Sequence, residues 1–379
     1  MENWSELPSE IIHSISLRID NLFDLIHFRS VCSFWRSSSL LKLRRMKAPR
    51  CPLPVDSGAY GDDCHVSTTR IYLVKSSSDH NGPRYCKPVR LFKIGENENG
   101  DIVLNRFFAR TSYYSRRVNP PFSLDLLRCQ VFELAQEHVA CSTWSDGFQR
   151  LVKLEEDIGF MSLGADNNEF MVLRNSIFTA PTVYRSVEER WTELQITHPD
   201  ANLEAIVSYR SKFYAIDITG RTIVVEPTYL QVTTFQRSRP CDKTRKRWLV
   251  NSEDKVLLVE LCSENHADFS IPDIREKKIW FEVSELDVER NDWNQVEDVG
   301  GRVLFLDEHC SFSYLATEIQ GFRGNSIIFP NLWERFNNPC EQESILVYEF
   351  NEQGVRCAED IPEYVDLLPS FPGWAISNA

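Results

Sequence analysis

The residues of this sequence that could bind a metal are three pairs of histidine and cysteine. They are His138-x-x-Cys141, Cys262-x-x-x-His266 and His309-Cys310. A structural zinc site needs four such ligands that converge in a tetrahedron. None of the three pairs is accompanied by a second pair at matching spacing. We therefore expect these residues to be buried or half-buried strand residues, and we expect no metal site and no cofactor.

Residues that could act as a nucleophile occur in two Ser-x-x-Lys motifs. Ser39-x-x-Lys42 and Ser252-x-x-Lys255 have the spacing of a serine–lysine pair, but so short a match arises by chance in most chains of this length. The sequence has no Gly-x-Ser-x-Gly nucleophile elbow to support either motif. Adjacent acids such as Glu188-Glu189 stand in turn-like surroundings that are typical of solvated loops. The sequence therefore predicts a protein that is not an enzyme and has no catalytic residues.

The highest local concentration of charge is a basic segment in an otherwise acidic part of the chain. Its cations are Arg237, Arg239, Lys243, Arg245, Lys246 and Arg247. Arginine matches the geometry of carboxylates and phosphates, so the segment could dock an acidic or phosphorylated partner, and it could also be a nuclear-import signal. A solvated loop between blades is an equally good interpretation.

The charge of the whole chain argues against binding to nucleic acid. The formal net charge is −13, yet the first fifty residues contain eight Lys or Arg and five Asp or Glu, so the remainder carries −16. A domain this acidic repels phosphate backbones. No run of about eighteen apolar residues suggests a membrane span, and the first residues do not resemble a signal peptide. We expect an intracellular protein of the nucleus and/or cytoplasm, whose eleven cysteines are free thiols.

The elements that must position these residues begin with a short helical segment. Pro8 suits a first helical position, and Asp20 and Asn21 suit the N-cap of a second helix. A unit of about forty residues cannot bury enough apolar surface to be securely stable. We therefore expect part of its apolar surface to be covered by a partner.

The rest of the chain is a succession of short segments rich in β-branched and aromatic residues, with turn residues between them. This spacing predicts an all-β sandwich, barrel or propeller. The segments are Arg70–Val74, Val89–Ile94, Cys129–Leu134, Glu169–Leu173, Lys212–Asp217, Lys255–Glu260, Lys278–Val283 and Ser344–Phe350.

A weak repeat favours the propeller. Residues 177–194 and 279–296 each read as a strand, a loop and then a tryptophan, Trp191 or Trp293, which we expect to pack between neighbouring sheets. Between these two repeats, the sequence predicts a hairpin that turns at Thr219-Gly220. Blades of ordinary length would number about six.

Two parts of the chain carry the motifs of a known family. The N-terminal segment contains Leu7-Pro8, the Ile11-Ile12-Ile15 face, Asp24-Leu25-Ile26, and Val31-Cys32 followed by Trp35-Arg36. With these residues it resembles the F-box, and residues 205–226, 248–259, 301–313 and 321–329 resemble the C-terminal domain of plant F-box proteins of the SKP-interacting-partner and KIB type. The resemblance implies a small all-α F-box module at residues 1–47, a linker at 48–66 and an all-β, kelch-like propeller of about six blades at 67–379.

The function that the resemblance implies is substrate recognition in an SCF-type (SKP–cullin–F-box) ubiquitin ligase. The F-box would dock onto the SKP adaptor, and through it onto the cullin and RING subunits. The propeller would recruit an unidentified protein target for ubiquitination and proteasomal degradation. The alternative is a non-ligase F-box scaffold or inhibitor that binds and occludes a partner protein. The residues that we expect to contact the adaptor are Leu7, Pro8, Ile11, Ile12, Ile15, Leu25, Val31, Cys32 and Trp35.

Overall fold

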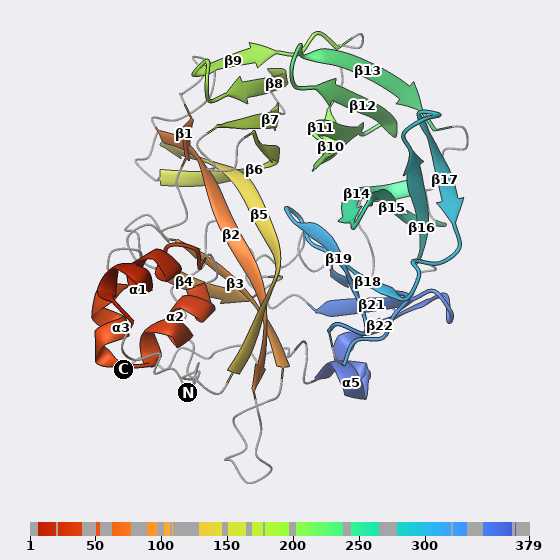
Figure 1. Ribbon diagram of the computed structural model, residues 1–379. Coiled ribbons are helices and arrows are strands. Elements are labelled where there is room, and N and C mark those ends of the chain that lie inside the picture. Colours follow the sequence, from red (N-terminus) through yellow and green to blue (C-terminus); the bar gives the residue numbers. More distant parts are fainter. Residues whose placement is uncertain are drawn as a thin grey trace. The chain divides into compact units, whose positions relative to one another are not determined.

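The chain divides into two compact units, which are described separately below (Figure 1). Unit 1 comprises residues 1–51, 67–109 and 115–137, and unit 2 comprises residues 52–66, 110–114 and 138–379. Most of the predicted linker at 48–66 lies outside the described residues. The computed structural model describes residues 7–19, 22–39, 51–53, 63–76, 89–96, 102–106, 108, 129–145, 151–163, 169–176, 179–196, 202–237, 244–264, 279–319, 321–331, 344–365 and 368.

Unit 1 begins with three short helices, α1 (Ser9–Ser16), α2 (Leu22–Ser30) and α3 (Ser33–Ser38). Pro8 is the N-cap of α1, one residue before the predicted position, and its carbonyl accepts bonds from the backbone N–H groups of Ile11 and Ile12 at 3.1 Å. Cys32 caps α3, because its Sγ accepts a bond from the Trp35 N–H at 3.4 Å. The predicted caps of the second helix, Asp20 and Asn21, lie outside the described residues.

A small apolar core holds the helices together. Ile12 and Leu25 are fully buried, and Trp35 is almost so. The rings of Phe28 and Trp35 lie 4.5 Å apart, measured between centroids. Phe23 packs edge-on against Tyr72 of strand β2 at 4.9 Å, so the helices share an apolar contact with a strand of the same unit.

The strands of unit 1 form an antiparallel sheet with one buried and one partly exposed ion pair. Strand β2 (Asp63–Ser76) pairs with β3 (Val89–Glu96), and β3 pairs with β4 (Ile102–Arg106). Two side chains of β5 (Cys129–Ser145) neutralise cations of this sheet: Glu137 bonds to the buried Lys93 at 2.8 Å, and Glu133 bonds to Arg70 at 3.0 Å. Burial, with Glu133 nearby, raises the pKa of Tyr72 to about 12. The short strand β1 (Cys51–Leu53) pairs with β2.

In the described part of unit 2 the strands form three four-stranded antiparallel groups and a fourth group of five strands, which we treat as four sheets. In the first three, the strands follow chain order from one edge to the other, and in the fourth the order is β19-β18-β20-β21-β22. The first three are β6 (Leu151–Ser162), β7 (Phe170–Ser176), β8 (Thr179–Arg185), β9 (Arg190–Glu193); β10 (Leu203–Tyr209), β11 (Lys212–Asp217), β12 (Arg221–Glu226), β13 (Gln231–Gln236); and β14 (Thr244–Ser252), β15 (Lys255–Ser263), β16 (Ile279–Asp287), β17 (Asp292–Val296). The fourth is β18 (Arg302–Leu306), β19 (Ser311–Leu315), β20 (Ser326–Pro330), β21 (Ile345–Glu349), β22 (Gly354–Cys357), followed by η5 (Ala358–Asp360) and α5 (Pro362–Val365). The end of β5 also pairs with β6, and the third and fourth groups join into one nine-stranded sheet.

Neighbouring sheets meet through the strands β6, β10, β14 and β19. Strand β10 contacts both β6 and β14, and β14 pairs in parallel with β19 where Asn251 is opposite Phe312. Strands β9, β13 and β17 are the outer strands of their sheets (Figure 1). Apolar side chains fill the space between neighbouring sheets, as Leu173 with Phe213 and Ile216 with Leu249 show. This succession of sheets is the arrangement of propeller blades.

The sequence predicted these strands well. Each segment predicted as a strand overlaps an observed strand, and the hairpin at Thr219-Gly220 is confirmed between β11 and β12, with Gly220 at a φ of +79°. Trp293 does pack between sheets, since its Nε1 donates to Thr222 Oγ1 of the preceding sheet at 2.7 Å. Trp191 contacts Tyr184 of its own sheet at 5.4 Å. The described part of unit 2 supplies four blade-like sheets, so a total of about six blades stays a prediction.

Among the described residues, no helix has the length and apolar character needed to cross a membrane.

Candidate functional site

The residues predicted to contact an adaptor separate into buried and exposed groups. Pro8, Ile11 and Val31 are exposed, and the side chains of Ile11 and Val31 keep 47% and 58% of their accessible surface. Leu7, Ile15 and Cys32 are half-buried. Ile12, Leu25 and Trp35 are buried and hold the helices together. Only the exposed group and part of the half-buried group are therefore available to a partner.

Helical geometry explains this separation. Ile11 and Ile15 are four residues apart and share one face of α1, whereas Ile12 is rotated by about 100° toward the core. Two further exposed apolar residues, Leu17 and Phe34, were not among the predicted contacts. No helical spacing pointed to Phe34, because Val31, three residues before it, precedes the N-cap Cys32 and lies outside α3.

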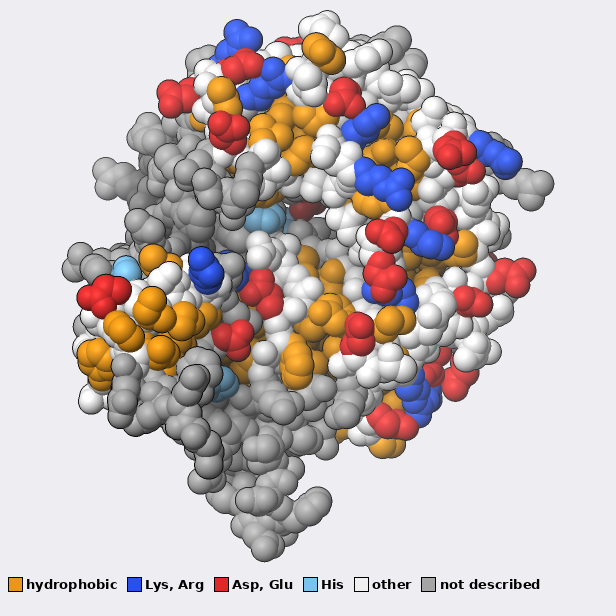
Figure 2. Space-filling model, viewed as in Figure 1, with side chains coloured by type: hydrophobic (Ala, Val, Ile, Leu, Met, Phe, Trp, Pro, Cys, Tyr) orange, Lys and Arg blue, Asp and Glu red, His pale blue; other side chains and the backbone are white. Residues whose placement is uncertain are grey.

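Apolar side chains gather on the surface of the helical segment (Figure 2). Eleven large apolar side chains are exposed among the described residues, and four of them, Ile11, Leu17, Val31 and Phe34, belong to these three helices and their ends. Single exposed apolar residues are ordinary on a protein surface, but a concentration on one small segment marks an interaction site.

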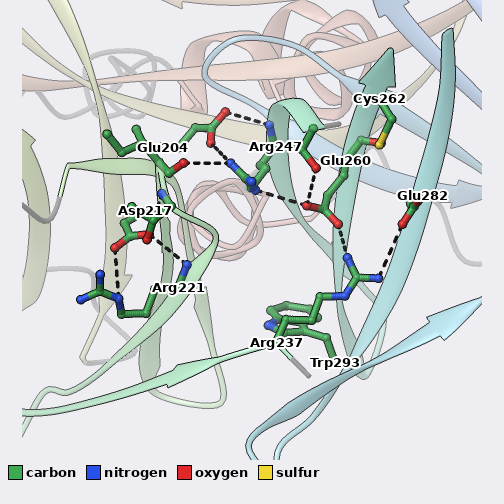
Figure 3. A network of polar contacts seen from close by, with 12 residues as sticks. Glu204, Asp217, Arg221, Arg237, Arg247, Glu260, Cys262, Glu282 and Trp293 are labelled. Atoms are coloured by element: carbon green, nitrogen blue, oxygen red, sulfur yellow. Dashed lines mark hydrogen bonds and ion pairs between the residues drawn. The ribbon is translucent and has the colours of Figure 1, made fainter. Parts of the chain in front are cut away.

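The basic segment has a structural role in its described part (Figure 3). Arg237 is buried and forms an ion pair with Glu260, with Glu282 at 3.8 Å. Arg247 bonds to Glu204 at 2.9 Å and to Glu260 at 3.2 Å. Glu260 is itself buried, so these arginines compensate a charge that would otherwise be costly.

The other cations of the basic segment have different environments. The Lys246 ammonium lies 6.0 Å from the centre of the Trp248 ring. Arg239, Lys243 and the side chain of Arg245 lie outside the described residues. The described arginines therefore tie β10, β13, β14, β15 and β16 together and are not available for a partner.

A polar hollow lies in unit 2 where the first strands of its sheets begin. It brings together His309 and Asp157, whose Nδ1 and Oδ1 atoms are 2.5 Å apart. Among the described residues, no group of three or more histidine, cysteine, aspartate or glutamate side chains is placed to hold a metal. The hollow is lined by Asp157, Ile158, Glu204, Ala205, Ile206, Lys246, Arg247, Trp248, Leu249, Glu308, His309, Cys310 and Ser311.

The remaining candidate pairs have structural partners. Lys255 bonds to Glu285 at 2.7 Å, while Ser252 Oγ accepts a bond from Ser313 Oγ at 2.9 Å, so neither serves the other. Ser39 Oγ donates to the Trp35 carbonyl at 2.8 Å. Lys42 and His266 lie outside the described residues.

The His138 and cysteine side chains are accounted for by packing. The ring of His138 stacks on that of Phe160 at 4.3 Å, and Cys141 and Cys262 are buried. These side chains lie on strands, as the sequence led us to expect. The same expectation was wrong for His309 and Cys310, which lie in the loop between β18 and β19.

Antiparallel sheets that follow one another through their first strands define a β-propeller protein. Comparison with known proteins identifies the family. Residues 130–349 match the KIB1-4 beta-propeller family, and the chain belongs to it. This confirms the resemblance found in the sequence.

Three relatives from Arabidopsis thaliana show how far the similarity extends. A protein named as an F-box/kelch-repeat protein is 60% identical over 381 residues, which cover all of both chains. A second F-box/kelch-repeat protein is 29% identical over 87% of this chain and 85% of its own length. The F-box protein SKIP23 is 25% identical over all of this chain and 97% of its own length.

Proposed function

We propose that this chain is the substrate-recognition subunit of an SCF-type ubiquitin ligase. In this proposal α1–α3 form an F-box that docks onto the SKP adaptor, and through it onto the cullin and RING subunits. The propeller holds a target protein for ubiquitination and proteasomal degradation. Two observations support the proposal: relatives that match along the whole chain are named F-box proteins, and the helices expose apolar side chains.

The observation that carries the proposal is the exposure of Ile11 and Val31 on a segment with so small a core. Fully burying a side chain of this kind stabilises an association by about 1.5–3 kcal/mol. Ile11, Val31 and Phe34 keep only about half of their surface exposed, so covering all three would contribute roughly 2–5 kcal/mol. The cost of association is about that size or larger, so the interface needs further contacts beside these three. Ile12, Leu25 and Trp35 then serve the interface indirectly, by fixing the positions of the helices.

The proposed contribution to the reaction is proximity. The chain makes and breaks no bond itself. Holding the target and the charged ubiquitin-conjugating enzyme in one assembly replaces a rare encounter with a local one, at an effective concentration set by the geometry of the assembly.

Co-purification with the SKP adaptor tests the proposal. We expect the Ile11→Ser/Val31→Ser double variant to lose adaptor binding while its far-UV circular dichroism and melting temperature stay unchanged, because both side chains lie outside the core. The matched control is Ile218→Ser/Val365→Ser, which removes two exposed apolar side chains from unit 2. A folded double variant that binds the adaptor as tightly as the wild type does would show that this face is not the docking surface.

A further inference from the structure

In unit 2, turns of successive sheets lie at the same end of the strands. In an antiparallel sheet whose strands follow chain order, two connections lie at the same end of the strands: the one from the first to the second strand, and the one from the third to the fourth. In unit 2 these connections include the turns β8–β9, β12–β13 and β16–β17, together with β10–β11 and β14–β15.

Hydrogen bonds hold these turns against one another. The Arg185 guanidinium at the end of β8 donates to the carbonyl of Thr228 at 2.8 Å, which joins the turns of the first two sheets. The Tyr209 hydroxyl donates to the Asp254 carbonyl, and the Asn251 side chain donates to the Ser208 carbonyl at 3.0 Å, which joins the second sheet to the third. This end of the strands is therefore a preorganised surface, and binding to it costs little ordering of the loops.

Three of the turns carry an exposed apolar side chain at the same place in successive sheets. Val187 lies in β8–β9, Tyr229 in β12–β13 and Val288 in β16–β17, with 68%, 84% and 39% of their surfaces exposed. Tyr229 is the most exposed large apolar side chain among the described residues. An exposed tyrosine on a fixed backbone provides a large contact area with few rotatable bonds, which makes it a frequent anchor of interfaces.

The charges that surround these side chains leave an excess of acid. Glu188 is neutralised by Arg185 and Arg190, whose hydrogen bonds lower its pKa. In the described part of the chain, the carboxylates of Glu189 and Glu289 have no cationic partner.

Most of the other charges on these turns are paired. Lys212 is paired with Glu226 and Arg290 with Asp287. Arg210 is the exception, because its guanidinium lies over the Tyr209 ring, 5.0 Å from its centre, and has no carboxylate partner among the described residues. It offsets one unpaired carboxylate, but Asp254 of the β14–β15 turn also lacks a cationic partner in the described part of the chain, so the excess stays acidic. A surface of this sign attracts a cationic partner and repels an acidic one.

We propose that these turns bind the target protein, through a segment of the target that combines apolar side chains with Lys or Arg. We call this site the turn surface and define it by Val187, Glu189, Tyr229, Val288 and Glu289. It deepens the proposed function and rests on it, because it names the chemistry of the substrate that the receptor recognises. The apolar residues provide the contact area, and the unpaired carboxylates select the charge of the segment.

Selection from a random displayed peptide library on the purified full-length chain tests the turn surface. We expect the selected peptides to contain both apolar and Lys or Arg residues. Their affinity should fall by about tenfold or more for Tyr229→Ser and for Glu189→Lys/Glu289→Lys, the size of effect expected of an interface anchor. The matched controls Ile218→Ser and Glu359→Lys remove an exposed apolar and an exposed acidic side chain elsewhere in unit 2, and they should leave the affinity unchanged.

Three results would overturn the proposal: no binding peptides, binders without cations, or binders whose affinity the turn-surface variants do not change. Because the adaptor is absent from this selection, its outcome is separate from that of the adaptor experiment. If adaptor binding proved absent, peptide binding could still be observed. If no peptide bound, the result of the adaptor co-purification would still stand.

Discussion

Arg237→Ala should destabilise the protein, because it breaks a buried ion pair. Arg237 and its partner Glu260 each keep about 4% of their side-chain surface exposed. Removing one member of a buried pair costs about 3–5 kcal/mol, since the other charge stays buried without compensation. Glu260 still keeps Arg247 at 3.2 Å and Thr244 Oγ1 at 3.0 Å, so we expect a loss near the lower end, about 3 kcal/mol.

Urea unfolding followed by tryptophan fluorescence measures this loss. The matched control is Arg290→Ala, whose guanidinium is 81% exposed and lies 3.7 Å from Asp287, so its removal should cost about 0.5 kcal/mol or less. In the Arg237→Ala/Glu260→Gln double variant the acid no longer carries a charge. Its free energy of unfolding should therefore fall by less than the two single losses combined.

The reasoning is refuted if Arg237→Ala costs no more than Arg290→Ala. That result would mean that Arg237 does not compensate Glu260 in the folded protein. Arg237 would then be available to a partner, as the docking interpretation of the basic segment requires.

Three further predictions concern packing, hydrogen bonding and pH. Gly159→Ala should cost about 1–3 kcal/mol in thermal unfolding, because a Cβ there would lie 2.7 and 2.8 Å from two apolar side chains. Gly354→Ala is its control, since the nearest atom would be 3.7 Å away, and equal melting temperatures for the two variants would contradict the prediction. Trp293→Phe should cost about 1–3 kcal/mol, because it leaves the buried Thr222 hydroxyl without its indole donor, and Thr222→Val added to it should cost little more. Burial raises the pKa of Tyr72 to about 12, so the unfolded chain loses this proton first and stability should fall as the pH rises from about 10 to 12. Tyr72→Phe should make that fall less steep, and an unchanged slope in a pH series of melting temperatures would argue against the shift.

The strands were predictable because each carries its own signal. Lys212–Asp217 was predicted with the bounds that the structure shows, since a short apolar run with two aromatic residues ends there at a turn marked by glycine. The role of Trp293 between sheets was also predicted, because an indole follows a hairpin both there and at Trp191; the contact with a neighbouring sheet is seen at Trp293.

The exposed apolar residues of α1–α3 were predictable only in part, because helices of one or two turns show too few residues to fix a face. Ile11 and Ile12 are adjacent in the sequence and equally apolar, yet one is exposed and the other is fully buried. The difference arises from the packing of α1 against α3, which no local pattern contains. Phe34 was overlooked as a contact for the same reason.

Two arginines of the basic segment show how cations in a charged run can be engaged within the fold, while docking or nuclear import through the segment stays a prediction. A run of cations looks available when its partners are distant in the sequence, as Glu204 and Glu260 are from Arg247. The turn surface has the opposite property, because Glu189 and Glu289 look like ordinary loop residues and gain meaning only when the sheets place them at one end of the strands. Substituting one member of a buried ion pair lowers the free energy of unfolding, whereas substituting an exposed turn side chain changes it little. Selection for a new target can therefore act on the turns while the Arg237–Glu260 pair stays fixed. If this reasoning holds, substitutions at Tyr229 should change which peptides bind and leave the free energy of unfolding unchanged, whereas substitutions at Arg237 should do the reverse.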